Sequence, residues 1–205
     1  MEYNNLATKE IVEKIIKSLK EKNIEAIYVE NSSDALEKIK KFIPVGASVM
    51  NGASQTLEKL GFVNYLKEGK HRWNNLHKSI IDESDPVKQA QLRKTSVLSD
   101  YYLGSVHALA ETGELVIASN TGSQLPHIVF TSTNLIFVVS TKKIVPTLKD
   151  AIDRLNNYVI PLEDERMMGI YKVHTNANKI VIFNGENPMM GRKVRIIFVN
   201  EDLGF

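Results

Sequence analysis

The stretch that decides the fold is IEAIYVENSSDALEKIKKFIPVGASVMNGASQTLEKLG, residues Ile24 to Gly61. Its opening residues, Ile24 to Val29, are rich in β-branched side chains and predict a strand. Asn31-Ser32-Ser33-Asp34 then supplies capping residues for an amphipathic helix, which Pro44 ends. Val45 to Met50 predicts a second strand, which leads into a short helix closed by a glycine. This alternation is typical of a parallel sheet in an α/β protein.

The same patterns continue on both sides of this stretch. An amphipathic helix starting near Thr8 precedes it, because apolar residues recur there at helical spacing. Residues Tyr65 to Ser84 have no clean period, and we interpret them as short helices over the sheet. Further helices are predicted at Pro86–Leu98 and Pro146–Tyr158, and strands at Tyr101–Val106, Leu115–Ser119, Leu135–Ser140, Lys179–Phe183 and Val194–Val199. With no internal repeat or linker, we expect one α/β domain over residues 1–205, with a mostly parallel sheet flanked by helices.

Composition excludes several classes of function. The 26 basic and 24 acidic residues give a net charge of +2, which is too small a bias to indicate nucleic acid or an anionic membrane as a partner. No apolar run approaches the roughly 20 residues that cross a bilayer, and the first residues lack an apolar signal core, so we expect a cytoplasmic protein. The sequence contains no cysteine, which excludes disulfides and cysteine-ligated iron–sulfur clusters.

One loop that could bind a ligand is Gly52-Ala53-Ser54-Gln55-Thr56, which lies between a predicted strand and a predicted helix. Hydroxyl and backbone N–H groups converge at such a position and suit a phosphate or a carboxylate. The alternative is that Ser54 only caps the helix and Gly52 only makes the turn. The loop lacks the P-loop lysine and the glycine spacing of dinucleotide-binding proteins.

A second loop of the same kind is Asn120-Thr121-Gly122-Ser123-Gln124, which follows the predicted strand Leu115–Ser119. Ligands of open α/β sheets bind at the carboxyl ends of strands, so this loop is a second candidate cradle for an anion or substrate. Lys142 and Lys143 follow another apolar strand, where a cation could meet an anionic ligand. Solvated surface lysines are the alternative.

The turn Glu111-Thr112-Gly113-Glu114 joins two strand-like runs and offers Glu111 as a nucleophile or general base. An ordinary hairpin turn with exposed acids is the alternative. His107 and Glu111 have the spacing of two metal ligands, but no third ligand is evident, and we predict no metal site. His127 is interpreted as a hydrogen-bonded structural histidine. The two loops and the glutamate turn make one site only if they meet in space.

Several segments, taken in order, resemble the LUD family, the family of the lactate-utilisation protein C. The resemblance extends over almost the whole chain and is weakest at residues 65–84 and 171–191. The segments that carry it are NGASQTL at 51–57, SDYYLGSVHALAETG at 99–113, ASNTGSQLP at 118–126, KIV at 143–145 with the helix to Arg154, and VNEDLGF at 199–205.

The resemblance implies a Rossmann-like sheet wrapped by helices, as in ribose-phosphate isomerases, glucosamine-phosphate deaminases and CoA transferases. It also implies a role in oxidising lactate to pyruvate beside iron–sulfur partner proteins. Some relatives carry a cysteine cluster before the last strands, whereas Met167-Met168-Gly169-Ile170-Tyr171 and the residues after it have none. In CoA transferases a glutamate in a glycine-containing turn attacks the thioester. Glu111 also lies in a glycine-containing turn, and the resemblance therefore implies the same role by analogy. Members of a family share their fold more reliably than they share a reaction.

Two hypotheses about function remain open. In the first, the chain is an enzyme or enzyme subunit acting on a small anionic metabolite, with the two loops as the binding site and Glu111 as base or nucleophile. In the second, it is a non-catalytic assembly subunit of an iron–sulfur lactate-oxidising complex. No cofactor is indicated, and a homodimer is compatible with a small α/β protein of this kind.

Overall fold

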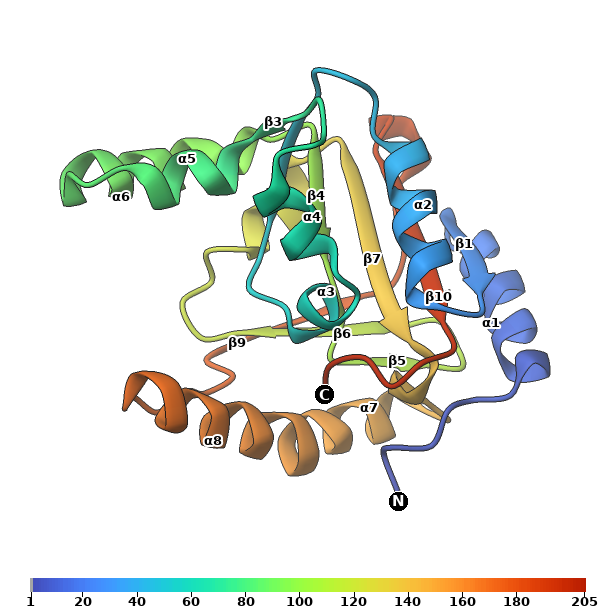
Figure 1. Cartoon of the computed structure of the whole chain (residues 1–205). Coiled ribbons are helices and arrows are strands. Elements are labelled where there is room, and N and C mark those ends of the chain that lie inside the picture. Colours follow the sequence, from blue (N-terminus) through green and yellow to red (C-terminus); the bar gives the residue numbers. More distant parts are fainter. Residues whose placement is uncertain (1) are drawn as a thin grey trace.

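Two β-sheets that share one hydrophobic core form the centre of the protein (Figure 1). The computed structural model describes residues 2–205. The larger sheet has six strands in the order β1-β10-β7-β4-β2-β3, and every neighbouring pair is parallel. Its strands are β1 (Ile24–Val29), β2 (Ser48–Asn51), β3 (Asn74–Asn75), β4 (Tyr101–Gly104), β7 (Asn134–Ser140) and β10 (Lys193–Val199). The predicted fold class, an α/β protein with a Rossmann-like parallel sheet, is confirmed.

The central strands of this sheet are apolar on both faces because both faces are covered. Along β7, Leu135 and Phe137 pack into the core shared with the second sheet, whereas Ile136 and Val138 pack on the opposite side. That opposite side is covered by α2 (Ser32–Phe42), α3 (Gln55–Lys59) and α4 (Phe62–Glu68), as Figure 1 shows. Helix α1 (Lys9–Glu21) covers the edge of the first face through Val12, Ile15 and Leu19.

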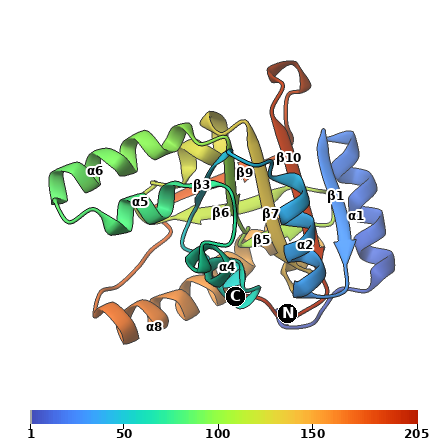
Figure 2. The ribbon, with the colours of Figure 1, turned by 45° about the horizontal axis from the view of Figure 1, so that its top comes forward.

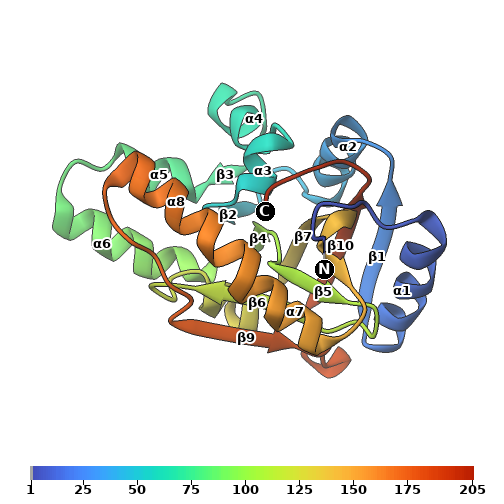
Figure 3. The same ribbon diagram turned by 90° about the horizontal axis from the view of Figure 1, so that it is seen from below.

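A second sheet of four strands was not expected from the sequence. Its order is β8-β5-β6-β9, formed by β5 (Ala108–Ala110), β6 (Leu115–Ser119), β8 (Ile144–Val145) and β9 (Lys179–Phe183). Residues of β6 alternate between its two faces: Leu115 and Ile117 join the shared core, whereas Val116 and Ala118 face α7 (Leu148–Arg154) and the π-helical turn η4 (Leu155–Val159). Figure 3 shows α7 and the later helix α8 (Ile160–Tyr171) lying across this outer face.

Local capping explains where the helices begin. Asn31 accepts a hydrogen bond from the Asp34 N–H at 2.9 Å, which starts α2 as predicted. The helix predicted from Pro146 instead starts at Leu148, because Thr147 and Asp150 form a capping box. It does not end at Tyr158 but continues through η4 into α8 (Ile160–Tyr171), and Pro161, which has no backbone N–H to donate, comes just after the π-helical turn.

The remaining elements lie around the sheets. An arm made of α5 (Leu76–Asp82), α6 (Pro86–Thr95) and the turn η1 (Ser96–Leu98) extends from the β3 edge, as Figures 1 and 2 show. Short helical turns complete the list: η2 (His127–Thr131), η3 (Thr141–Lys143) and η5 (Pro188–Met190). Within residues 2–205, no helix combines the length and the apolar character that a membrane crossing needs.

Candidate functional site

A cavity of about 480 Å³ opens at the carboxyl ends of three neighbouring strands of the parallel sheet. Residues 52–56 after β2, residues 105–107 after β4 and Lys143 after β7 form one wall. Residues 119–121, Ser123 and Gln124, after β6, form a second wall. The third wall comes from η4 and α8, with Thr175 and Phe205. This is the edge at which α/β sheets bind ligands.

Residues 52–56, the 52–56 loop, approach the second sheet closely. A methyl group on Gly52 would overlap the Tyr102 hydroxyl and lie 2.9 Å from the Gln124 Oε1. Glycine at this position therefore allows the loop to reach the other wall. Ser54 accepts a hydrogen bond from the Leu57 N–H at 3.3 Å, so it caps α3 and also lines the cavity. Ser54 is therefore both the N-cap of α3 and a residue of the cavity wall.

Residues 120–124, the 120–124 loop, are held in place by hydrogen bonds to both sheets. Gln124 donates from Nε2 to the Ala118 carbonyl at 3.0 Å and accepts from the Tyr102 hydroxyl at 3.2 Å. Thr121 and Ser123 form a hydroxyl pair at 3.2 Å. Gly122 makes the turn at a φ of 86° and does not itself line the cavity. The two predicted loops therefore meet, with Tyr102 between them.

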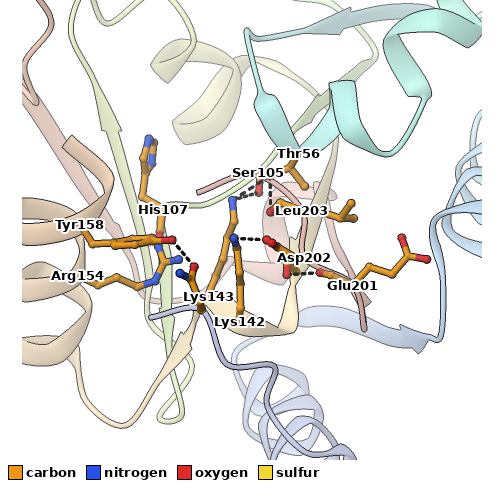
Figure 4. Close-up of polar contacts among 12 residues, drawn as sticks. Thr56, Ser105, His107, Lys142, Lys143, Arg154, Tyr158, Glu201, Asp202 and Leu203 are labelled. Atoms are coloured by element: carbon orange, nitrogen blue, oxygen red, sulfur yellow. Dashed lines mark hydrogen bonds and ion pairs between the residues drawn. The ribbon is translucent and has the colours of Figure 1, made fainter. Parts of the chain in front are cut away.

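Lys143 stands where the two sheets come together. Its Nζ atom lies 2.9 Å from Thr56 Oγ1, 3.1 Å from Ser105 Oγ and 3.1 Å from the Val106 carbonyl oxygen. These partners follow β2 and β4, so the amine connects three strand ends (Figure 4). The residue is only 4% exposed and is part of the cavity wall. It is not a solvated surface lysine.

The charge buried around Lys143 is entirely basic. The charged side chains that are buried in the described chain are Lys142, Lys143 and Arg154. Lys142 forms an ion pair with Asp202, whereas Lys143 has no carboxylate within 4.0 Å among residues 2–205. Burial lowers the pKa of Lys143 well below its usual value, and the positive charges of Arg154 and Lys142 lower it further.

Arg154 is fully buried behind His107. Its Nη1 donates to the His107 carbonyl oxygen, and its guanidinium carbon lies 5.8 Å and 5.1 Å from the ring centres of Tyr3 and Tyr158. The Nε and Nη2 atoms have no hydrogen-bond partner among the described residues. Burial lowers the pKa of His107 to about 3, with a smaller contribution from Lys143 and Arg154, so its imidazole is neutral.

Glu111 lies outside the cavity. It follows β5, which begins beside the cavity at His107 and runs away from it, so the turn after this strand lies at the far end. The Glu111 carboxylate instead faces Lys14 of α1 at 3.6 Å. The glutamate turn therefore does not join the two loops, and Glu111 is not among the residues that line this cavity.

The histidines have structural surroundings. His107 accepts a hydrogen bond from the Ala118 N–H at 3.0 Å, and within the described residues no group of three His, Cys, Asp or Glu could hold a metal. His127 is buried, with Nδ1 3.2 Å from Ser99 Oγ and 3.0 Å from Ser132 Oγ. The hydrogen bonds of His127 agree with its interpretation as a structural histidine.

The third wall was not predicted. On α8, Glu163 and Arg166 form a bidentate pair with two N–O distances of 2.7 Å. Met167 and Tyr171 extend the same wall. Nothing in the sequence marked these residues, because the helix was expected to end at Tyr158 and an i,i+3 ion pair is common on exposed helices. Ser105 belongs to one of the segments that resemble the LUD family, but the sequence gives no sign that its hydroxyl group contacts Lys143.

These features define an α/β protein with a ligand-sized cavity at the carboxyl ends of parallel strands. The chain belongs to the LUD domain family, which matches residues 12–185. It is similar to the crystal structure of a DUF162 family protein from Deinococcus radiodurans, with 11% sequence identity, a TM-score of 0.59, and coverage of 96% of this chain and 100% of that chain. At this identity the likeness shows the fold alone. No curated protein matches the chain.

Proposed function

We propose that this LUD-domain protein binds a small metabolite bearing a carboxylate or a phosphate, and that it serves in lactate utilisation, in which lactate is oxidised to pyruvate. One observation carries the proposal: the 52–56 and 120–124 loops line a single cavity beside buried charges that are all basic. Hydroxyl groups of Ser54, Thr121 and Ser123 supply hydrogen-bond donors for the anion. Arg154, which is fully buried and has no carboxylate within 4.0 Å among the described residues, gives this region a positive potential, which favours an anionic ligand.

Family membership supports the lactate-utilisation part of the proposal, and the cavity supports the binding part. Lactate oxidation releases two electrons, and this sequence has no cysteine to ligate a cluster that would accept them. We therefore assign electron transfer to iron–sulfur partner proteins. Glu111 plays no part in the proposal, because it lies outside the cavity.

Ligand binding is tested by thermal shift with lactate, pyruvate, CoA thioesters and sugar phosphates, because a ligand that binds the native state raises the melting temperature by mass action. The Ser54→Ala/Thr121→Ala variant should lose the shift. Its intrinsic melting temperature should also fall, because Ser54 caps α3, so each shift is measured against the ligand-free variant.

The matched control is Ser79→Ala/Thr95→Ala, which removes two exposed hydroxyl groups from the arm and should keep the full shift. Equal binding by the cavity variant and the control would contradict the site. A well-folded wild type that responds to none of these ligands would contradict the function.

A second function, assembly of iron–sulfur partners without catalysis, is favoured by the arm. Ile81, Val87 and Leu98 are 62%, 78% and 73% exposed there. Exposed apolar side chains gathered on one projection indicate a protein-binding surface. Co-purification with the partners that is lost when these three residues are changed to serine would support this function, and unchanged co-purification would contradict it.

A further inference from the structure

The amine of Lys143 has the surroundings of a nucleophile. A lysine that serves only as a cation is normally paired with a carboxylate or exposed to water. Lys143 has neither arrangement, since it is 4% exposed and meets two hydroxyl groups and one carbonyl oxygen. Its neighbour Lys142, equally buried, does have an acidic partner in Asp202. The contrast between these two adjacent lysines shows that the missing partner is particular to Lys143.

The three contacts suit a neutral amine. An uncharged amine donates two hydrogen bonds and accepts one through its lone pair. The Val106 carbonyl can only accept, whereas the hydroxyl groups of Thr56 and Ser105 can either accept or donate. One hydroxyl can thus accept from the amine while the other turns its proton from a long contact with a carbonyl oxygen, that of Leu203 for Thr56 at 3.5 Å or that of Val106 for Ser105 at 3.4 Å, and donates to the lone pair. Charges near the amine come from Arg154, Lys142 and Lys59, all positive, and they disfavour its protonation.

We propose that Lys143 forms an imine with the carbonyl carbon of a 2-oxo acid or an aldehyde bound in the cavity. The inference rests on the proposed function, because the loops that bind the acid group bring the carbonyl to the amine. Pyruvate, the oxidised partner of lactate, is a 2-oxo acid and has the required group. Carbonyl ligands therefore bind covalently, whereas the corresponding hydroxy acids bind without a bond to the protein.

The step balances without an oxidant or a reductant. The Nζ lone pair attacks the carbonyl carbon, and the C=O π electrons move to oxygen, which takes a proton while the nitrogen loses one. The Thr56 and Ser105 hydroxyl groups, 2.9 and 3.1 Å from the nitrogen, can relay that proton. The carbinolamine then breaks its C–O bond, and water leaves as the C=N bond forms and nitrogen gives up its second proton.

The test is reductive trapping with sodium cyanoborohydride in the presence of pyruvate, glyoxylate or glyceraldehyde 3-phosphate. Trapping makes the imine a stable secondary amine, which intact mass and peptide mapping locate. We expect one adduct at Lys143, formed at least tenfold faster than at any exposed lysine. Lactate and pyruvate binding are measured by thermal shift in the same samples.

Two variants serve as controls. Lys143→Arg should abolish the adduct, and Lys94→Arg, which changes an exposed lysine of α6, should leave it unchanged. Mapping on the wild type keeps the test valid if Lys143→Arg does not fold. Ligand binding without an adduct at Lys143 from any of the three carbonyl compounds overturns the imine and leaves the proposed function standing. Neither binding nor adduct overturns both.

Discussion

The Nζ atom of Lys143 lies 2.9 Å from Oγ1 of Thr56, a residue 87 positions earlier in the chain. The bond joins the end of β7 to the first turn of α3, which follows β2. Because both groups are buried, neither can exchange the bond for water. The position of the 52–56 loop therefore depends on this contact as well as on the cap made by Ser54.

Replacing Thr56 with valine should destabilise the protein and weaken ligand binding. The change keeps the side-chain volume but removes the hydroxyl group, which leaves the buried amine one partner short. A lost partner of this kind costs about 1–3 kcal/mol of unfolding free energy. Urea unfolding measures the loss. Thr95→Val, on the exposed face of α6, is the control and should change stability by less than about 0.5 kcal/mol.

Gly204 should not tolerate a side chain. A methyl group there would overlap Thr56 Oγ1 and lie 3.1 Å from the Thr56 backbone nitrogen and 3.3 Å from Lys143 Nζ. Gly204 also has a φ of 70°, which strains any other residue. Gly191 has nearly the same φ, 69°, with nothing within 4 Å of the added methyl. Gly204→Ala should therefore lose about 1–3 kcal/mol more than Gly191→Ala in urea unfolding. Equal losses would show that the contact with Thr56 is not tight.

Most of the parallel sheet could be predicted from the sequence, because its buried strands are continuous apolar runs with clear flanking signals. Strand β1 has the predicted bounds, and β7 and β10 each begin one residue earlier than predicted; β6 and β9, whose bounds were also predicted, belong to the second sheet. The second sheet could not be predicted, because β5 and β8 are three and two residues long and pair through contacts distant in sequence. Such short segments have no readable period.

The candidate site was predicted in part. Both loops could be found because small polar residues followed apolar strands, and the structure answers the open question of whether they meet, since both line one cavity. The position of Glu111 relative to the cavity could not be predicted, because the direction in which β5 runs is set by tertiary packing. The burial of Lys143 could not be predicted either. A Lys-Lys pair after a strand has the same sequence pattern whether it is exposed to solvent or covered by a second sheet.

Mild acid should destabilise the protein through His127. Burial lowers the pKa of His127 from its ordinary value of 6.5 to about 4 in the folded state. The unfolded chain therefore takes up a proton first as the pH falls below about 6.5, so stability is complete above that value and is lost down to about pH 4. Between pH 7 and pH 5 the loss from this residue is about 2 kcal/mol. Urea unfolding at the two pH values measures it.

Variants separate His127 from other titrating groups. His127→Gln should be less stable at pH 7, because it breaks the contacts with Ser99 and Ser132, yet it should lose less between pH 7 and pH 5 than the wild type does. His107, whose pKa is also lowered, keeps part of the acid sensitivity in this variant. Thr95→Val, which changes no titrating group and lies on exposed α6, should retain the wild-type pH dependence. An unchanged pH dependence in His127→Gln would contradict the assignment.

Removing the charge of Arg154 should slow imine formation at neutral pH. After burial, this charge is the largest influence that lowers the pKa of Lys143, so Arg154→Met should raise that pKa and leave less neutral amine at pH 7. Trapping at Lys143 should then fall severalfold at pH 7 and recover as the pH rises, because the neutral fraction increases with pH. Arg154→Lys retains a positive charge and should restore much of the neutral-pH rate, and Arg93→Met, on exposed α6, is the control. A purely structural role for Arg154 predicts a different result, in which trapping falls by the same factor at every pH.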